Sequence, residues 1–398
     1  NENLFPFQKD IVSWSLKKGM SSIFADCGLG KTIMELAWAE QIPGRVLIVA
    51  PLAVGIQTQH EGDKFGVKAT YCRDDDDRHQ IAITNYEMLH NFDLNEFHGI
   101  VLDESSILKS FTGKVRNQII NGVQHIPYRL AATATPSPND LMEIGNHSEF
   151  VSNYSMAEML ATYFVHDGGE TQKWRLKGHA KNDFWQWMCS WACYIRKPSD
   201  IGHTDSAFVL PQLKTHHVTV EDVDNDTDLL FAMPASTLSE RQQARKRTIQ
   251  DRVNATAQLC NGDANQWLVW CNLNAENDAL AKAIPDAVTV KGSDSIDKKT
   301  KALMGFTDGS VRVLVTKPSI AGFGMNWQHC NNMVFTGLSD SYEQFYQAVR
   351  RSWRFGQKKQ VNVYVVTADT EGAVVSNIKR KEASADMMYE GMKGYLLK

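Results

Sequence analysis

Short apolar runs alternate with segments of helical periodicity along most of the chain, which is the pattern of parallel strands joined by crossover helices. In the first part of the chain the apolar runs cover residues 23–25, 46–50, 81–84, 100–102 and 129–132. A second set covers residues 267–271, 287–290, 311–316, 332–336 and 361–366. The pattern predicts an α/β fold with two parallel sheets, each flanked by helices.

The stretch between the two sets of runs differs in composition. Residues 156–194 are rich in Met, Trp and helix-forming residues, and the segment that follows contains Pro198 and Pro211. This shift indicates a domain boundary. We therefore predict a first lobe at 1–150, a helical insertion attached to it at 151–197, a linker at 198–213 and a second lobe at 214–398.

Composition excludes several classes of protein. Of the 398 residues, 43% are hydrophobic and 22% charged, which is enough apolar material for about two or three globular domains. The chain contains no apolar run near the roughly 20 residues of a membrane span, and its first residues lack a signal-peptide pattern. We therefore expect a cytoplasmic protein with no membrane partner.

Seven cysteines are scattered along the chain, and this odd number favours reduced thiols over a disulfide framework. Cys189 and Cys193 lie about one helical turn apart, a spacing with which two thiols can share a metal ion. No second pair with ligand spacing accompanies them. Buried structural thiols are therefore the favoured interpretation.

Charge gives only local indications of a nucleic-acid partner. The formal net charge is −4, whereas phosphate-binding surfaces usually make a protein basic. Basic residues cluster at 241–252, 350–359 and 379–381. A solvated helix face is the more frequent explanation of each cluster taken alone.

Residues 25–32, with the sequence ADCGLGKT, lie between a short apolar run and a segment of helical periodicity. Gly28 and Gly30 permit a tight turn whose backbone N–H groups point at phosphate oxygens. Lys31 would then reach the β- and γ-phosphates of ATP, and the Thr32 hydroxyl would bind Mg²⁺. The alternative is a glycine-rich turn without a ligand, but the loop, the lysine, the threonine and the flanking elements together favour a nucleotide.

Asp103 and Glu104 directly follow the apolar run 100–102. Carboxylates at the end of a buried parallel strand are costly unless a charged group faces them, and a magnesium nucleotide at this edge of the sheet supplies one. Asp103 would hold Mg²⁺ through water, and Glu104 would orient or deprotonate the attacking water. An isolated Asp-Glu pair is often only a polar loop, but this pair follows a phosphate loop in the same alternating fold.

With these two motifs in place, the chain resembles the superfamily 2 helicases and, within them, the Swi/Snf family of double-stranded DNA translocases. Further segments match the family's motifs in order: 5–8 (FPFQ), 50–52 (APL), 83–89 (ITNYEML), 103–106 (DESS), 133–136 (TATP), 321–328 (AGFGMNWQ) and 347–357 (QAVRRSWRFGQ). The resemblance extends over nearly the whole chain. It implies two tandem RecA-like lobes that use ATP and Mg²⁺.

The resemblance also implies roles for individual residues. Beside the phosphate loop and Asp103, the implied nucleotide contacts are Gln8, which reads adenine, and Gly324. The implied catalytic residues are Glu104, Gln347, Arg351 and Arg354, with the two arginines acting as fingers on the ATP. The implied contacts to nucleic acid are Pro51, Tyr86, Thr133 and Asn326.

The chain departs from the family pattern in two places. Ser105 and Ser106 stand where Ala and His are frequent, and Arg350 stands where glycine is usual. Neither change removes a residue that binds phosphate or Mg²⁺ or acts as a finger, so ATP hydrolysis remains the expectation. Coupling between the motifs at 103–106 and 133–136 would have to use the Ser106 hydroxyl or another group.

These features predict an ATP-dependent translocase or helicase that couples hydrolysis at the lobe interface to movement on duplex or branched DNA. Its minimal size suggests a monomer of phage or bacterial origin, working in the cytoplasm and directed to its target by partner proteins or by the lobes themselves. The alternatives are a strand-separating helicase on RNA or single-stranded DNA and a slow ATP-gated switch. In the insertion Trp174, Trp185, Trp187 and Trp191 offer stacking platforms for bases, but core packing is the favoured interpretation.

Overall fold

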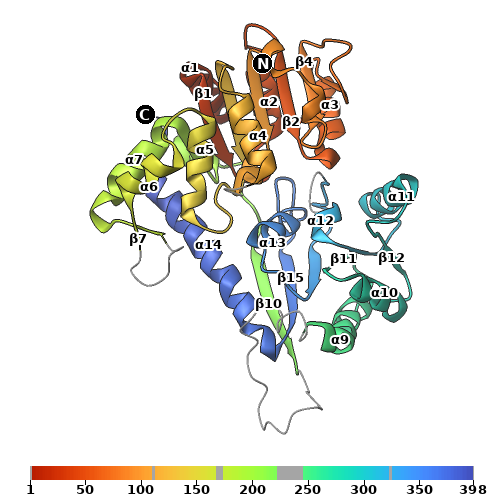
Figure 1. Ribbon diagram of the computed structural model, residues 1–398. Coiled ribbons are helices and arrows are strands. Elements are labelled where there is room, and N and C mark those ends of the chain that lie inside the picture. Colours follow the sequence, from red (N-terminus) through yellow and green to blue (C-terminus); the bar gives the residue numbers. More distant parts are fainter. Residues whose placement is uncertain (1, 110–112, 167–173, 222–244, 322–324, 398) are drawn as a thin grey trace. The chain divides into compact units, whose positions relative to one another are not determined.

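The computed structural model describes residues 2–109, 113–166, 174–221, 245–321 and 325–397. The chain forms two compact units, one of Asn1–Phe208 with Ala383–Lys398 and one of Val209–Glu382 (Figure 1). Each unit has its own parallel sheet and its own apolar core. This architecture confirms the predicted α/β class and is consistent with two RecA-like lobes.

The sheet of the first unit is built from strands whose side chains are buried on both faces. In spatial order the strands are β3 (Thr70–Tyr71), β4 (Ile81–Asn85), β2 (Val46–Ala50), β5 (Gly99–Asp103), β6 (Tyr128–Thr133), β1 (Met20–Ala25) and β9 (Ala192–Ile195). Every residue of β2, β4 and β5 is buried, as expected of parallel strands covered by helices. Asp103 lies opposite Ala132 and Phe24 opposite Thr133, so β5, β6 and β1 end at the same edge of the sheet.

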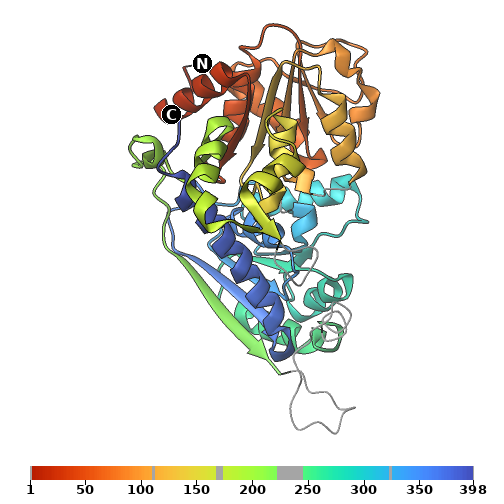
Figure 2. The ribbon, with the colours of Figure 1, turned by 60° about the vertical axis from the view of Figure 1, so that its left-hand side comes forward.

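Helices lie on both faces of this sheet (Figure 2). They are α1 (Pro6–Lys18), α2 (Lys31–Ala39), α3 (Leu52–Phe65), α4 (Lys114–Gly122), α5 (Ile144–Phe150), α6 (Met156–Tyr163) and α7 (Lys181–Trp191). Short 3-10 helices are η1 (Leu89–Asn91), η2 (Leu94–Glu96), η3 (Ser105–Lys109), η4 (Leu141–Glu143), η5 (Gly178–Ala180) and η6 (Pro198–Ile201). Local sequence sets some of the ends: α1 begins with a proline in its first turn, and the Ser155 hydroxyl accepts from the backbone N–H of Glu158 at the start of α6.

The insertion is less helical than the sequence predicts. It contains an antiparallel hairpin of β7 (Phe164–His166) and β8 (Trp174–Leu176), and its last strand, β9, joins the main sheet as a parallel partner of β1. Cys193 of β9 lies opposite Ile23 of β1. Residues 192–195 come directly after the apolar helix α7 in the sequence, so periodicity alone does not distinguish this strand from a continuation of the helix.

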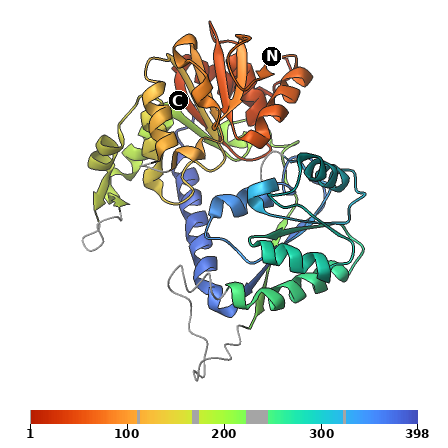
Figure 3. The same ribbon diagram turned by 45° about the vertical axis from the view of Figure 1, so that its right-hand side comes forward.

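The second unit repeats the parallel architecture. Its strands in spatial order are β10 (Leu213–Val220), β15 (Val361–Ala368), β14 (Asn332–Thr336), β11 (Trp267–Cys271), β13 (Val313–Thr316) and β12 (Ala287–Thr289). Its helices are α9 (Ile249–Asn261), α10 (Asn274–Ala283), α11 (Ile296–Thr307), α12 (Pro318–Ala321), α13 (Tyr342–Val349), the 3-10 helix η7 (Asp369–Glu371) and α14 (Gly372–Met392). Helices α9 and α10 lie side by side and share one apolar cluster, while α11, α13 and the start of α14 contribute to the other (Figure 3).

The C-terminal segment packs differently from the predicted division. Val374 of α14 belongs to the core of the second unit, but Met388 and Met392 are fully buried in the core of the first. Residues 383–398 therefore form part of the first unit, although we expected them in a second lobe at 214–398. The reason is that the second half of α14 carries apolar side chains that match the apolar face of α7, where the Cys189 thiol donates to the carbonyl of Met392.

Candidate nucleotide-binding site

The phosphate loop connects β1 to α2 at the carboxyl edge of the first sheet. Gly28 and Gly30 have positive φ values of 92° and 80°, which only glycine adopts without strain. A Cβ atom on Gly30 would also lie 2.4 Å from Nε2 of Gln8. Both the backbone conformation and the packing therefore require glycine at position 30, and the helix that follows presents its N-terminus to the loop.

Lys31 is the first residue of α2 and lies half-buried beneath the loop, where its Nζ donates to the carbonyl of Ala25 at 3.2 Å. Burial lowers the pKa of Lys31, but the nearby Cys27, Glu104 and Asp103 outweigh this effect and raise the pKa above its ordinary value. The ammonium group therefore remains charged at the place where phosphates are expected. Thr32, the next residue, is half-buried beside it.

Asp103 and Glu104 stand at the end of β5, at the same sheet edge as the loop. Burial and the neighbouring Glu104 raise the pKa of Asp103 to about 7. Glu104 has a φ of 51°, a left-handed conformation that is unusual for a residue with a side chain. Its backbone N–H donates to Asp103 Oδ1 at 2.8 Å, so the two carboxylates are held in a tight local turn.

The structure adds Glu35, which the sequence reading missed. It lies on α2, one turn after Lys31, and is fully buried. Burial and the adjacent Asp103 raise the pKa of Glu35 well above its usual range. The signal in the sequence was an acidic residue in the middle of the apolar stretch IMELAWA, where a solvated carboxylate has no place.

These carboxyl groups fit a bound Mg²⁺ as charge partner. Glu35, Asp103 and Glu104 all lie close enough to Lys31 to raise its pKa, so three carboxyl groups surround one cationic side chain. No cluster of His, Cys, Asp or Glu side chains able to enclose a metal ion occurs in the described part of the chain. The hydroxyl of Thr32 and the carboxylate of Asp103 are oxygen donors of the kind that Mg²⁺ prefers, and their binding of the cation, through water for Asp103, stays a prediction.

Tyr86 and Thr133, which we expected to contact nucleic acid, lie in the interior beside the carboxylates. The Tyr86 hydroxyl donates to the carbonyl of Asp103 at 2.7 Å. The Thr133 hydroxyl donates to Oε2 of Glu104 at 3.3 Å and accepts from the backbone N–H of Thr135 at 3.1 Å. The link between the motifs at 103–106 and 133–136 thus includes a direct contact of Thr133 with Glu104, and Ser106 Oγ donates to the Glu104 carbonyl at 3.4 Å.

Gln8 is also buried, and its amide is engaged on both sides. Its Nε2 donates to the carbonyl of Leu29 at 2.8 Å, and its Oε1 accepts from the backbone N–H of Phe5 at 2.9 Å. Phe5 itself is 43% exposed and packs edge-on against Phe208. The structure therefore places Gln8 behind the phosphate loop, with an exposed aromatic ring beside it. Pro51, a predicted nucleic-acid contact, is half-buried and directly precedes α3 as its N-cap residue.

The remaining predicted residues come together in the second unit. Gln347 is fully buried on α13, and its carbonyl accepts from Nε of Arg351 at 3.0 Å. Arg351 also donates to the carbonyl of Met325 at 3.1 Å, and Arg354 donates to Oδ1 of Asn326. Gly324 lies outside the described residues.

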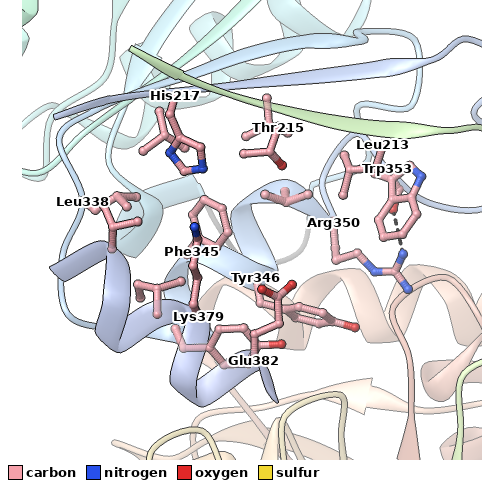
Figure 4. A pocket seen from close by; sticks show the side chains of 16 residues that line it. Leu213, Thr215, His217, Leu338, Phe345, Tyr346, Arg350, Trp353, Lys379 and Glu382 are labelled. Atoms are coloured by element: carbon pink, nitrogen blue, oxygen red, sulfur yellow. Dashed lines mark hydrogen bonds between the residues drawn. The ribbon is translucent and has the colours of Figure 1, made fainter. Parts of the chain in front are cut away.

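Arg350, the departure from the family pattern, lines a cavity of about 220 Å³ within the second unit (Figure 4). The cavity is bounded by β10, β15, α13 and α14, and its walls are mostly apolar. Arg350 is almost fully buried, with its guanidinium 4.7 Å from the ring centroid of Trp353. The long side chain thus fills space beside the cavity that a glycine would leave open.

The tryptophans and cysteines of the insertion are chiefly structural. Trp185 and Trp191 are buried, which confirms packing for these two, whereas Trp187 is half-buried and stacks on the partly exposed ring of Tyr154 at 5.4 Å. Trp174 is half-buried in β8. All seven cysteines are free, and Cys189 and Cys193 are buried thiols.

Comparisons with known proteins find similarity to helicases. The helicase conserved C-terminal domain matches residues 251–356, the segment that contains Gln347, Arg351 and Arg354. The bifunctional helicase and thymine dioxygenase JBP2 of Leishmania tarentolae is 35% identical over 100 residues, which are 24% of this chain and 9% of that protein. Helicase SWR1 of Cryptococcus neoformans is 31% identical over 170 residues, which are 35% of this chain and 14% of that protein.

A relative of similar length is the putative protein p41 of Acyrthosiphon pisum secondary endosymbiont phage 1, which is 22% identical over 98% of both chains. By contrast, this chain covers only a small part of the length of JBP2 and SWR1. Together these similarities support a superfamily 2 helicase domain in the second part of this chain. In the described segments no helix combines the length and the apolar character of a membrane span.

Proposed function

We propose that this chain is an ATP-dependent DNA translocase or helicase that uses hydrolysis to move on duplex or branched DNA. The observation that carries the proposal is the convergence of the phosphate loop, Lys31, Asp103 and Glu104 at one edge of the first sheet. The match of residues 251–356 to a helicase domain supports it independently. Similarity to p41 along the whole chain supports a minimal, phage- or bacterial-type enzyme of the host cytoplasm.

In the proposed reaction, backbone N–H groups of the loop and the Lys31 ammonium bind the β- and γ-phosphates of ATP. Thr32 and, through water, Asp103 would hold Mg²⁺, which would supply positive charge beside the phosphate oxygens. Glu104 accepts a proton from the attacking water at its carboxylate. The Thr133 hydroxyl donates to this carboxylate, and the Tyr86 hydroxyl donates to the backbone carbonyl of the preceding residue, Asp103.

The second unit would complete catalysis. Arg351 and Arg354 would act as fingers that stabilise the charge developing on the transferred phosphoryl group, and Gln347 would position them. Because residues of both units would act on one ATP, each cycle of binding and hydrolysis would drive relative motion of the units. Contacts to DNA phosphates, among them those of Pro51 and Asn326, would convert this motion into movement without sequence preference.

The direct test is ATP hydrolysis measured with duplex DNA, single-stranded DNA, RNA and no nucleic acid. We expect a low rate for the protein alone and a severalfold or greater rise with duplex DNA that decreases steeply with added salt. Equal or greater stimulation by RNA or single-stranded DNA would favour a strand-separating helicase instead. No hydrolysis with any of them would contradict the proposal.

A further inference from the structure

A buried hydrogen bond joins Ser105, the residue after Glu104, to a helix that is distant in sequence. Ser105 Oγ and Nε2 of His147 on α5 lie 3.0 Å apart, and both residues are at most 1% exposed. The imidazole also meets the edge of Phe24 on β1, with ring centroids 5.2 Å apart. Neither side chain is required by the proposed chemistry, so this contact needs its own explanation.

The contact lies where the backbone is strained. The left-handed φ of Glu104 persists only if its surroundings hold it, because this conformation costs free energy. The Thr133 hydroxyl bonds to the Glu104 carboxylate. The next residue, Ser105, is bonded to His147 of α5, a helix distant in sequence. The Ser105–His147 bond therefore sets the direction in which the chain leaves Glu104.

His147 acts here as a neutral hydrogen-bonding group. Burial lowers the pKa of His147 to about 3, so the ring is uncharged over the working range of an enzyme near neutral pH. The bond to Ser105 is then independent of pH above about 5. The neutral imidazole therefore restrains Ser105 through a hydrogen bond and adds no charge to the site.

The other side of α5 is joined to the insertion. A Cβ atom on Gly145 would lie 2.6 Å from the sulfur of Met156, so α5 and the first helix of the insertion, α6, approach closely at this glycine. The backbone N–H of Met156 donates to Oε1 of Glu149 at 2.7 Å. Helices α5 and α6 are therefore in direct contact, and Gly145 is only two residues from His147.

We propose that His147 is a positioning residue that couples the insertion to Glu104 through Ser105. This inference rests on the proposed ATP hydrolysis and names a route within the first unit by which an event at the insertion reaches the catalytic carboxylate. A displacement of about 1 Å at a catalytic group is enough to reduce a rate about a hundredfold. The link thus adjusts turnover with little effect on the binding of ATP.

The test compares Ser105→Ala, His147→Phe and His147→Gln, in which Phe keeps the ring packing and Gln keeps a hydrogen-bonding side chain. Ser15→Ala is the matched control, because Ser15 is equally buried in the same unit and its hydroxyl bonds to Ser21, away from the loop and the carboxylates. With duplex DNA we expect Ser105→Ala and His147→Phe to reduce kcat about tenfold or more with KM for ATP within about twofold. His147→Gln should recover much of kcat, and the double variant Ser105→Ala, His147→Phe should be no worse than the single ones.

Hydrogen exchange provides a second measurement that does not require turnover. In Ser105→Ala we expect faster exchange both at residues 103–109 and in α6, with wild-type exchange in Ser15→Ala. Wild-type kcat in folded Ser105→Ala and His147→Phe, or the same loss of kcat in Ser15→Ala, would overturn the inference. If the wild type hydrolyses no ATP, the proposed function fails by itself, and unchanged exchange in α6 would then overturn the coupling separately.

Discussion

The side chain of Gln8 donates a hydrogen bond from Nε2 to the carbonyl of Leu29, 2.8 Å away, and so ties α1 to the phosphate loop. Its Oε1 accepts from the backbone N–H of Phe5, which fixes the start of the same helix. Gly30 leaves room for this amide, since any side chain there would collide with it. Gln8 therefore supports the shape of the loop, in addition to any contact with adenine.

Replacement of Gln8 should weaken nucleotide binding through the loop. In Gln8→Glu the side chain keeps its size but can no longer donate to Leu29, and an unsatisfied carbonyl in this position costs about 1–3 kcal/mol. We expect KM for ATP to rise about tenfold, with a smaller change in kcat. Gln41→Ala is the control, because Gln41 makes a comparable bond to the Ala37 carbonyl at the far end of α2. Unchanged KM in Gln8→Glu would show that the Leu29 bond does not shape the site.

Lys31→Ala should abolish hydrolysis and leave DNA affinity within about twofold. The ammonium group faces Asp103 and Glu104 inside the first unit, where it neutralises phosphate of the nucleotide and not of the duplex. Hydrolysis and DNA binding are measured on the same preparation, with Lys9→Ala, an exposed lysine of α1, as control. A folded Lys31→Ala protein that no longer binds DNA would contradict the assignment of the loop.

Strands in the middle of a sheet could be predicted from sequence, whereas of the four edge strands of the two parallel sheets only β12 was among the predicted runs. Continuous apolar runs give β2, β11 and β14 with the bounds that the structure has, because strands covered by helices have no polar face. The edge strand β10 was missed, since its sequence LKTHHVTV alternates with polar residues and resembles a loop. The packing of 383–398 with the first unit depends on contacts far apart in sequence, which a local pattern does not contain.

The same limit applies to the site. The phosphate loop and the Asp-Glu pair are local motifs, so their residues could be found from spacing alone. Tyr86 contacts the backbone carbonyl of Asp103 and His147 contacts Ser105 only through the packing of other elements, at separations of 17 and 42 residues. The contacts of such residues are set by the three-dimensional fold, which explains why the resemblance gave Tyr86 only as a nucleic-acid contact and not its bond to Asp103.

A buried ion pair should dominate the stability of the second unit. Arg252 donates to Oε1 of Glu276 at 2.6 Å and to the carbonyl of Thr336 at 3.0 Å, and all three residues are fully buried. Arg252→Leu leaves the Glu276 carboxylate without this partner, which typically costs about 3–5 kcal/mol. Chemical denaturation should show this loss, whereas Lys298→Ala, which breaks an exposed pair with Asp294, should cost about 0.5 kcal/mol. Similar losses in the two variants would argue against the importance of burial.

His147 should make the first unit sensitive to acid. The folded-state pKa of His147 is about 3, below the value of 6.5 for an exposed histidine, so between these values the unfolded chain binds a proton that the native chain excludes. Its contribution to stability is therefore complete above pH 6.5 and is lost as pH falls towards 3, by about 1.4 kcal/mol per pH unit. Urea unfolding at pH 7, 6 and 5 should show a steeper loss for wild type than for His147→Phe. Parallel pH dependences would show that the imidazole is accessible to protons.

Arg351 and Arg354, the two arginines proposed to act as fingers, differ in burial and in hydrogen-bond partners. Their replacement should therefore have different effects. Arg351 is buried and bonds to the carbonyls of Gln347 and Met325, so Arg351→Ala should lower stability as well as turnover. Arg354 is half-buried and bonds to Asn326, so Arg354→Ala should leave the fold intact. If Arg354 stabilises the transition state, its removal should reduce DNA-stimulated kcat about a hundredfold or more, with ATP affinity largely kept.

The competing explanation for Arg354 is a phosphate contact to DNA. In that case Arg354→Ala would weaken DNA binding and reduce the slope of log affinity against log salt by about one, and saturating DNA would restore kcat. Lys358→Ala serves as the control, because Lys358 belongs to the same basic cluster and is exposed. Turnover measured at saturating ATP and saturating DNA therefore decides between the two, since only a group that acts on the transition state lowers the rate when both ligands are fully bound.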